Sequence, residues 1–106
     1  MLLEKKDIFT YIIFQNSDKI EELKNKIEIT LSESDNLIID IQNININKEK
    51  LVLSFLNYHS LWKKINKSFI LVINDSKIDF DNEIVCLPTL NEAVEYLFMD
   101  ELERNV

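Results

Sequence analysis

The stretch 36–55 reads NLIIDIQNININKEKLVLSF and sets the plan of the chain. Its apolar beginning, 37–41, is typical of a central strand that is covered on both faces, and Asp40 stands near the end of that strand. Residues 43–47 then alternate between polar and apolar types, so an extension of the strand competes there with a loop. A helix is expected to follow Asn47, which is a suitable N-cap residue, and to run to about residue 65.

The carboxyl end of this strand is the place where function is expected. In open α/β sheets, ligands and partners usually dock at the carboxyl ends of the strands. Asp40 and the segment 42–47 stand at such an end. No catalytic constellation is recognisable in the stretch, so the sequence locates a docking site without naming its occupant.

The rest of the chain supplies the other layers of an α/β domain. Aromatic, β-branched and apolar runs predict strands, and apolar residues at helical spacing predict helices. The strands fall at 9–15, 68–74 and 84–87, and the further helices at 18–33 and 90–103. We expect a single domain over residues 1–106, with a four-stranded, mostly parallel sheet that packs with three main helices through right-handed crossovers.

The first and the last helix each begin with a capping-box pattern. Asp18 precedes Glu21 by three residues, and Thr89 precedes Glu92 by the same spacing. In such a box the first side chain accepts a hydrogen bond from a backbone N–H of the helix, and the second side chain reaches back. The pattern therefore predicts N-caps at Asp18 and Thr89.

Composition excludes several classes of function. The chain contains no glycine, so neither a Walker-type phosphate loop nor a Rossmann fingerprint is present. Its net charge of −7 argues against general nucleic-acid binding, which rests on many phosphate contacts. No apolar span reaches the length of a transmembrane helix, and no signal-peptide pattern is present. With a lone Cys86, which we place in the core, we expect a reduced, cytoplasmic protein without nucleic-acid or membrane partners.

One segment departs from the acidic balance of the chain. Residues 44–67 carry five lysines against Glu49 alone, which gives a local sum of +4. Such a segment complements an acidic protein surface, although a solvated helix face has the same composition. Both interpretations stay open on the sequence.

Single residues offer little support for catalysis or metal binding. His59 lies on the apolar side of its predicted helix, where a satisfied, half-buried imidazole is the expectation. A nucleophile elbow needs flanking glycines, and the acidic residues of 75–83 lack the spacing and the glycine of an EF-hand. We therefore expect no catalytic residue, no metal site and no cofactor.

Asp40 also invites comparison with the phosphoacceptor of a receiver domain. Receivers need in addition an acidic pair at the end of their first strand and a lysine on a late strand. Here Gln15-Asn16 and Asn74-Asp75 occupy the corresponding strand ends. The alternative function is therefore that of a small-ligand-binding or degenerate receiver-like signalling domain, which uses the strand end near Asp40.

With these elements in order, the chain resembles a STAS domain, the fold of bacterial anti-sigma-factor antagonists. The run 37–41 looks like the apolar strand and Asp of that family, and the segment after it looks like the switch loop that leads into the second helix. The run 88–94, PTLNEAV, looks like the closing strand and last helix. The resemblance covers most of the chain from about Phe9 and implies a non-enzymatic regulatory module that binds another protein.

The chain departs from that family in an informative way. Members that switch carry a phosphorylatable hydroxyl at the head of the second helix, in an Asp-Ser-Ser/Thr-Gly-type sequence. The aligned residues here, 48–51, read KEKL and have no hydroxyl, so phosphorylation control is not implied. The chain also looks similar to small stand-alone STAS-like proteins of Bacteroidetes that are often labelled ribonuclease Z. A single histidine cannot build the His-x-His-x-Asp-His zinc site of that enzyme, so the label does not fit this chain.

The resemblance implies that a partner binds the loop and the first turns of the second helix. The residues assigned to this surface are Asp40, Asn45, Asn47, Lys48, Glu49 and Lys50. The expected partner is another protein whose acidic surface complements the lysines, and a second copy of the chain is the alternative partner.

Overall fold

The sheet is built in chain order, so each strand lies next to the strand that precedes it in the sequence. The computed structural model describes residues 1–15, 18–43, 48–73 and 83–104, and for 42, 43 and 48–52 it describes the backbone only. Its strands are β1 (Leu2–Lys5), β2 (Phe9–Gln15), β3 (Asn36–Asn43), β4 (Phe69–Val72) and β5 (Val85–Leu87). Its helices are α1 (Ile20–Ser32), α2 (Lys48–Lys64) and α3 (Leu90–Arg104). β1 pairs antiparallel with β2, and every later pair of neighbours is parallel.

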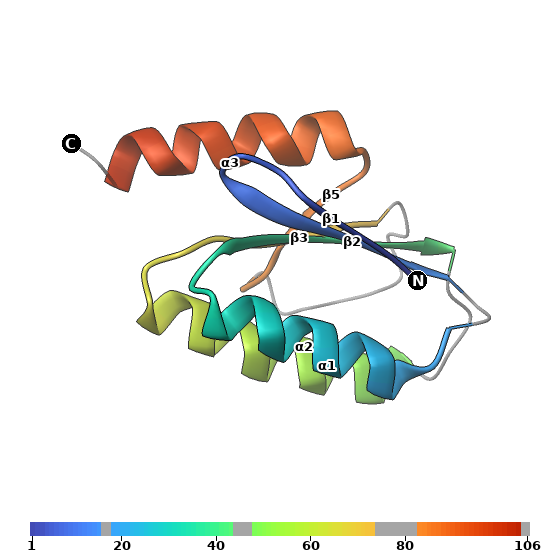
Figure 1. The fold of residues 1–106 in the computed structure, drawn as a ribbon. Coiled ribbons are helices and arrows are strands. Elements are labelled where there is room, and N and C mark those ends of the chain that lie inside the picture. Colours follow the sequence, from blue (N-terminus) through green and yellow to red (C-terminus); the bar gives the residue numbers. More distant parts are fainter. Residues whose placement is uncertain (16–17, 44–47, 74–82, 105–106) are drawn as a thin grey trace.

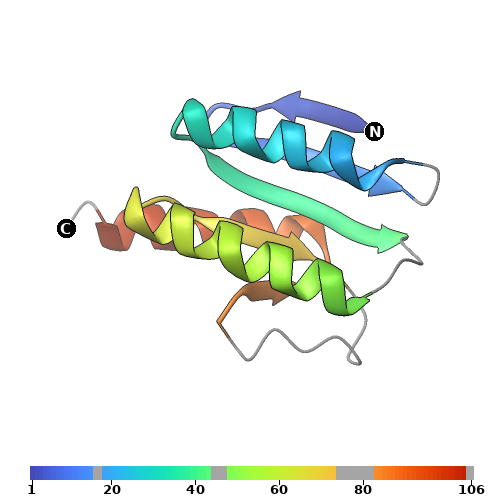
Figure 2. The same cartoon turned by 90° about the horizontal axis from the view of Figure 1, so that it is seen from below.

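The helices cover the two faces of the sheet unequally. Parallel neighbours need a crossover between them, and α1 and α2 follow β2 and β3 in this role. Both helices lie below the sheet in Figure 1, whereas α3 lies above it. The view from below in Figure 2 shows α1 and α2 side by side across one face. The predicted α/β class, with one domain and a mostly parallel sheet, is confirmed.

The predicted count of four strands is wrong, because residues 2–5 add a fifth strand in the described part of the chain. Leu2 pairs with Ile13 and Lys5 pairs with Thr10 in an antiparallel ladder at the edge of the sheet. The run LLEK is too short and too mixed to show a strand period in the sequence. Short strands with charged side chains are typical of sheet edges, where they discourage pairing with other chains.

β3 passes through the middle of the core. Leu37, Ile39 and Ile41 point toward α1 and α2, whereas Ile38 points toward α3, and each is at most 1% exposed. This confirms the prediction of a central strand covered on both faces. The strand continues to Asn43, so the extension that competed with a loop is present as far as the structure describes this segment.

Trp62 fixes the carboxyl-terminal half of α2 against the sheet. Its side chain is fully buried, and its ring centroid lies 5.3 Å from that of Phe69. The indole N–H donates a hydrogen bond of 2.8 Å to the carbonyl oxygen of Asp35. A buried indole needs such an acceptor, so Trp62 sets both the depth and the rotation of the helix.

Asn36 joins three segments at the amino end of β3. Its side-chain amide donates to the carbonyl oxygen of Ile8 and to the carboxylate of Glu101, each at 2.8 Å. Its amide oxygen accepts a hydrogen bond of 2.8 Å from the backbone N–H of Ser68. The asparagine is only 2% exposed, so it links the start of β2, the start of β4 and α3 inside the protein.

Arg104 completes the attachment of α3. Its guanidinium donates to the carbonyl oxygen of Asn66 at 2.6 Å, contacts the hydroxyl of Ser68 and pairs with Asp100 at 3.4 Å and with Glu101 at 3.3 Å. The hydroxyl of Ser68 in turn donates to Asp100. The last turn of α3 is therefore held to the turn that joins α2 to β4.

The predicted N-cap at Asp18 is wrong. α1 begins at Ile20 with Lys19 in the N-cap position, and no side chain caps it. The carboxylate of Asp18 instead accepts the backbone N–H of Gln15 at 2.8 Å and pairs with the amino group of Met1 at 2.9 Å. The carboxylate of Asp18 therefore binds groups outside α1 instead of capping the helix.

The predicted N-cap at Thr89 is confirmed. α3 begins one residue later, and the threonine hydroxyl accepts a hydrogen bond of 3.2 Å from the backbone N–H of Glu92. The carboxylate of Glu92 reaches back to the same hydroxyl at 3.3 Å. The reciprocal contact therefore forms on the side chain of the capping residue.

Candidate functional site

Asp40 lies on the face of the sheet that carries α3. It is half-buried in β3, three residues before the strand ends at Asn43, and its carboxylate oxygen Oδ2 accepts a hydrogen bond of 3.0 Å from the hydroxyl of Tyr11. The register places Ile13 directly beside Asp40 and Tyr11 beside Ile38. The phenol therefore reaches diagonally from one strand to the next, a distance that a long aromatic side chain spans.

Glu4 extends this arrangement onto β1. It pairs directly with Tyr11 across the antiparallel ladder, and its carboxylate also binds Lys6 at 2.9 Å. Glu4, Tyr11 and Asp40 thus form a polar row across three strands, here called the Tyr11 row. Glu4 was not a candidate on the sequence because residues 2–5 were not predicted as a strand.

The chemistry of the Tyr11 row is that of a fixed hydrogen-bond donor. Burial raises the pKa of Tyr11, and the carboxylates of Asp40 and Glu4 raise it further. The phenol therefore stays protonated at neutral pH and donates to Asp40. A tyrosine in this state orients its carboxylate neighbour and does not act as a base.

The first turn of α2 lies at the same end of the molecule as the carboxyl end of β3. Figures 1 and 2 both show the arrowhead of β3 and the start of α2 on the right-hand side. Lys48, Glu49 and Lys50 form this first turn. Asn45 and Asn47, which were also assigned to the site, lie outside the described residues. The structure thus brings Asp40 and the first turn of α2 to one end of the domain.

The outward face of α2 carries leucines that are not covered. Leu53 is 66% exposed, and Leu61, two turns further along, is 37% exposed. Helical spacing puts the backbone positions of Glu49 and Lys50 on the same face as Leu53, one turn before it. Charged and apolar positions therefore adjoin each other on this face.

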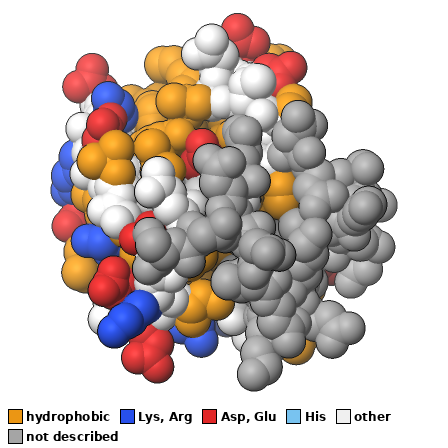
Figure 3. Space-filling model, turned by 90° about the vertical axis from the view of Figure 1, so that its right-hand side faces the viewer, with side chains coloured by type: hydrophobic (Ala, Val, Ile, Leu, Met, Phe, Trp, Pro, Cys, Tyr) orange, Lys and Arg blue, Asp and Glu red, His pale blue; other side chains and the backbone are white. Residues whose placement is uncertain are grey.

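Figure 3 looks at the molecule from the side on which β3 ends. Apolar side chains gather in its upper part, which is the side of the sheet that carries α3, and acidic groups stand around them. The partly buried apolar residues of this layer include Ile13, Leu87 and Leu90. In the part of this view that is not grey, the α3 side of the sheet is therefore apolar with acidic groups around it.

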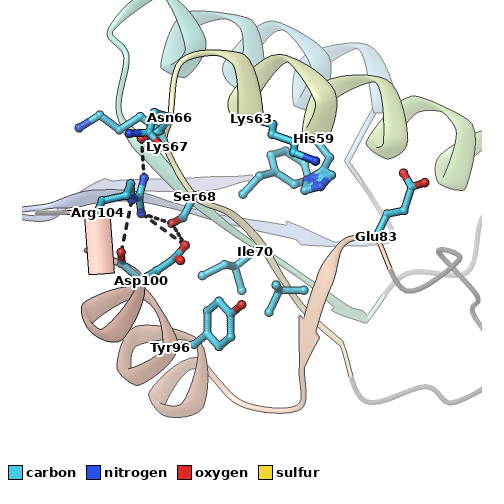
Figure 4. A pocket seen from close by; sticks show the side chains of 12 residues that line it. His59, Lys63, Asn66, Lys67, Ser68, Ile70, Glu83, Tyr96, Asp100 and Arg104 are labelled. Carbon is cyan, nitrogen blue, oxygen red and sulfur yellow. Dashed lines mark hydrogen bonds and ion pairs between the residues drawn. The ribbon is translucent and has the colours of Figure 1, made fainter. Parts of the chain in front are cut away.

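A pocket of about 350 Å³ lies at the opposite end of the sheet, where β4 begins. Figure 4 shows it between α2 and α3, with His59 and Lys63 on one side and Tyr96, Asp100 and Arg104 on the other. Its residues come from four elements that are far apart in the sequence, so no local motif marks it. We call it the α2–α3 pocket.

His59 lies at the edge of this pocket, and the surroundings of its ring differ from the prediction. The ring is half-buried, as expected, but its Nδ1 is shut off from solvent and has no hydrogen-bond partner in the part of the chain that the structure describes. The prediction of a satisfied imidazole is therefore wrong for this nitrogen. Burial lowers the pKa of His59, the carboxylate of Glu83 opposes this shift and the ammonium of Lys63 adds to it.

The prediction that Cys86 lies in the core is wrong. The thiol lies on the edge strand β5 and its residue is exposed, although shielding by neighbouring atoms raises its pKa to about 11. It is protonated at neutral pH and is a weak nucleophile in that form. Among residues 1–15, 18–43, 48–73 and 83–104, no group of three His, Cys, Asp or Glu side chains is arranged to hold a metal ion.

The helices of the described chain include none that is both long enough and apolar enough to span a bilayer.

Comparison with known proteins adds no family to these observations. No family model matches the chain, and no curated protein is similar enough to it to count as a match.

Proposed function

We propose that this protein is a non-enzymatic, cytoplasmic regulatory module of STAS type that binds another protein at the end of β3 and the first turns of α2. The observation that carries the proposal is the exposed Leu53 on the same helix face as the first turn of α2. A leucine that is 66% exposed gains free energy when a partner covers it. The charged turn beside it supplies the polar rim that protein interfaces have around their apolar centre.

The charges of this turn favour an acidic partner. Lysines in the first turn of a helix are disfavoured by the helix dipole, which prefers carboxylates there. Lys48 and Lys50 flank the single carboxylate of Glu49, so the local sum is positive in a chain of net charge −7. An acidic surface on the partner would offset the unfavourable dipole term and also steer the encounter.

The proposed surface is permanently in its binding state and is not switched by phosphorylation. The aligned positions of the resembled family carry a hydroxyl that is phosphorylated, and residues 48–51 of this chain have none. Added phosphate would place roughly two negative charges at the helix start and oppose an acidic partner. Without an acceptor, the lysines stay available to the partner at all times.

The first experiment compares wild type with the double variant Lys48→Glu, Lys50→Glu and with Leu53→Glu, each used as bait in extracts of the native cytoplasm. Both variants should keep the circular dichroism of the wild type and lose at least tenfold in capture of the same protein. For the lysine variant the loss should be greater at about 0.05 M salt than at about 0.3 M, because the screening length shortens as salt rises.

The matched control moves the same charge change to α1. Lys19 and Lys24 are both exposed, so the double variant Lys19→Glu, Lys24→Glu should capture the partner as well as wild type does. If the partner is a second copy, sedimentation should show a wild-type dimer that Leu53→Glu dissociates. Equal capture by wild type and by the folded Lys48→Glu, Lys50→Glu variant would remove this surface from the proposal.

A further inference from the structure

Exposed apolar side chains are concentrated on α3. Of the large apolar residues that are exposed in the described part of the chain, half lie on this helix, namely Tyr96, Phe98, Met99 and Leu102. Phe98, Met99 and Leu102 are 52%, 63% and 69% exposed. Single apolar residues are ordinary on a protein surface, but several together on one helix mark an interaction surface.

Three of these side chains form one stripe together with Val94. Positions 94, 98 and 102 have the i, i+4 spacing that puts side chains on one side of a helix, and Met99 lies next to them. The fully buried Leu97 marks the side of α3 that faces the sheet. The stripe therefore begins beside the sheet at the half-buried Val94 and turns outward to Met99. We call Val94, Phe98, Met99 and Leu102 the α3 stripe.

A groove of about 450 Å³ lies beside the α3 stripe. It is formed by α3 and the turn that joins β1 to β2, and residues 5–9 line it together with Val94 and Phe98. We call it the α3 groove. In the view from below, α3 lies behind β4 and α2, whereas no described helix lies behind β1 and β2 (Figure 2). The α3 side of the sheet thus has an open half next to the helix that carries the exposed stripe.

The groove and the stripe carry opposite charges. Lys5 and Lys6 line the groove, and the ion pairs that they form within the chain are exposed and therefore weak. Glu95 and Glu103 are exposed on α3, one turn before and one turn after Met99. If the stripe of another copy enters the groove, its flanking carboxylates come close to these lysines.

A second copy of the chain can fill the groove and cover the stripe at the same time. In a two-fold dimer a surface patch contacts itself, so the stripe of each copy enters the groove of the other. A foreign helix would fill the groove but would leave most of the stripe of α3 exposed. The opposite face of the sheet already carries two helices, α1 and α2, and the dimer would place a second helix beside α3 as well.

We propose that two copies of this chain associate through α3 into a two-fold dimer. Phe98, Met99 and Leu102 form its apolar centre, and the lysines of each groove pair with carboxylates of the other α3. The contact is limited to a helix of 15 residues and the groove beside it. It is therefore smaller than the standard interface of about 800 Å² per partner, and we expect a dissociation constant of about 10–100 μM. The dimer shares no residue with the surface proposed for the protein partner.

Sedimentation equilibrium of the full chain between about 5 μM and about 1 mM tests this association. Wild type should change reversibly from monomer to dimer over this range. Met99→Glu with Leu102→Glu should raise the dissociation constant at least tenfold, because it places unpaired charges at the centre of the interface. Both residues are largely exposed, so circular dichroism should show that the variant is folded.

The matched control places the same two charges on other helices. Ile29→Glu on α1 with Leu53→Glu on α2 also replaces two exposed apolar side chains by carboxylates. This double variant should dimerise with a dissociation constant within twofold of that of wild type. Leu53→Glu should lose the protein partner and keep the dimer, whereas Met99→Glu with Leu102→Glu should lose the dimer and keep the partner. Failure of one proposal is thus distinguishable from failure of the other.

Two further measurements locate the contact. Lys6→Glu should raise the dissociation constant at least threefold, whereas Lys24→Glu, which changes an exposed lysine of α1, should leave it unchanged. Amide NMR signals of residues 5–9 and of α3 should shift with the degree of association. The signals from the first turn of α2 should not shift.

Three results would overturn the proposal. A monomer at every concentration up to about 1 mM would exclude the dimer. An equal loss of association in Ile29→Glu with Leu53→Glu would assign the effect to net charge or to the surface on α2. Concentration-dependent NMR shifts that are confined to residues outside 5–9 and α3 would place the contact elsewhere.

Discussion

Tyr11 shows how one buried hydroxyl links the stability of the protein to pH. The pKa of its phenol is raised by burial and then by Asp40 and Glu4, from an ordinary value of 10.0. The folded state therefore keeps a proton that the unfolded state releases above about pH 10. The stabilisation is fully present below that pH and is lost as the pH rises through the ordinary value toward the raised one.

We predict that Tyr11→Phe makes the alkaline loss of stability less steep. Urea denaturation of wild type and variant from pH 8 upward measures the free energy of unfolding at each pH. The slope above about pH 10 should decrease in the variant without reaching zero, because the pKa values of Tyr58 and Cys86 are raised as well. Parallel curves for the two proteins would contradict the assignment to Tyr11.

The sequence located single residues better than it predicted their contacts. Asp40 was placed on a central strand because an apolar run closed by a carboxylate is a local signal, but the strand extends to Asn43, beyond its predicted end at residue 41. Its contact with Tyr11 joins positions that are 29 residues apart, and no period in the sequence encodes such a contact. The enclosed Nδ1 of His59 likewise depends on what packs around the ring. Cys86 was misplaced because β5 is an edge strand, which the apolar run around the thiol did not reveal.

Helices and strands were predictable where a helical period or an apolar run marked them, including the short runs 37–41 and 84–87 that became β3 and β5. The run FTYIIFQ became β2 with the predicted bounds, and the apolar spacing of α1, α2 and α3 gave each helix to within about two residues. β1 was missed because four mixed residues carry no period. The strand exists because β2 offers it a partner, and that cause lies outside its own residues.

The two capping boxes separate local from distant causes. Thr89 caps α3 as predicted, since its hydroxyl and the first turn of the helix are the only groups required. Asp18 occupies an equivalent local pattern, but Met1 and Gln15 compete for its carboxylate. A box is therefore a reliable signal only where no other donor reaches the side chain.

We predict that Thr89→Ala lowers the free energy of unfolding by about 1 kcal/mol, the usual cost of losing a threonine N-cap. Thr89→Ser keeps the hydroxyl and should retain most of this stability. Chemical denaturation followed by circular dichroism measures both. An unchanged midpoint for the alanine variant would show that the hydrogen bond to Glu92 contributes nothing.

The molecule as a whole depends on how α3 is attached to one face of the sheet. α1 and α2 share the other face, so among the described helices only α3 covers the layer that contains Phe9, Ile38 and Ile70. Its own apolar contribution is modest, with Ala93 and Leu97 as its fully buried residues, while Phe98 and Leu102 are largely exposed. The polar contacts of Glu101 with Asn36 and of Arg104 with Asn66 and Ser68 add to this attachment. The ion pairs of Arg104 with Asp100 and Glu101 have helical spacing within α3, whereas its contacts with Asn66 and Ser68 join positions far apart in the sequence, as do those of Asn36.

Substitution of Asn36 measures how much its hydrogen bonds contribute to the attachment of α3. Asn36→Ala leaves the carbonyl of Ile8 and the N–H of Ser68 without their partners in a site that is 2% exposed. Each buried group left unsatisfied costs about 1–3 kcal/mol, so we expect a total loss of about 2–6 kcal/mol in the free energy of unfolding. The exposed residue Asn25 serves as the control, and Asn25→Ala should change this free energy by less than about 0.5 kcal/mol.

Asn36→Asp distinguishes lost hydrogen bonds from lost volume. The aspartate keeps the shape of the side chain and an acceptor for Ser68, but it loses both donors and sets a second carboxylate against Glu101. Burial and this neighbour raise the pKa of the new carboxyl in the folded state, so the variant loses stability as the pH rises above about 4. Urea denaturation at pH 7 should show at least the loss seen in Asn36→Ala, and part of it should be recovered near pH 4.5. Equal stability of Asn36→Asp and wild type at pH 7 would mean that the donor hydrogen bonds of Asn36 contribute nothing to holding α3.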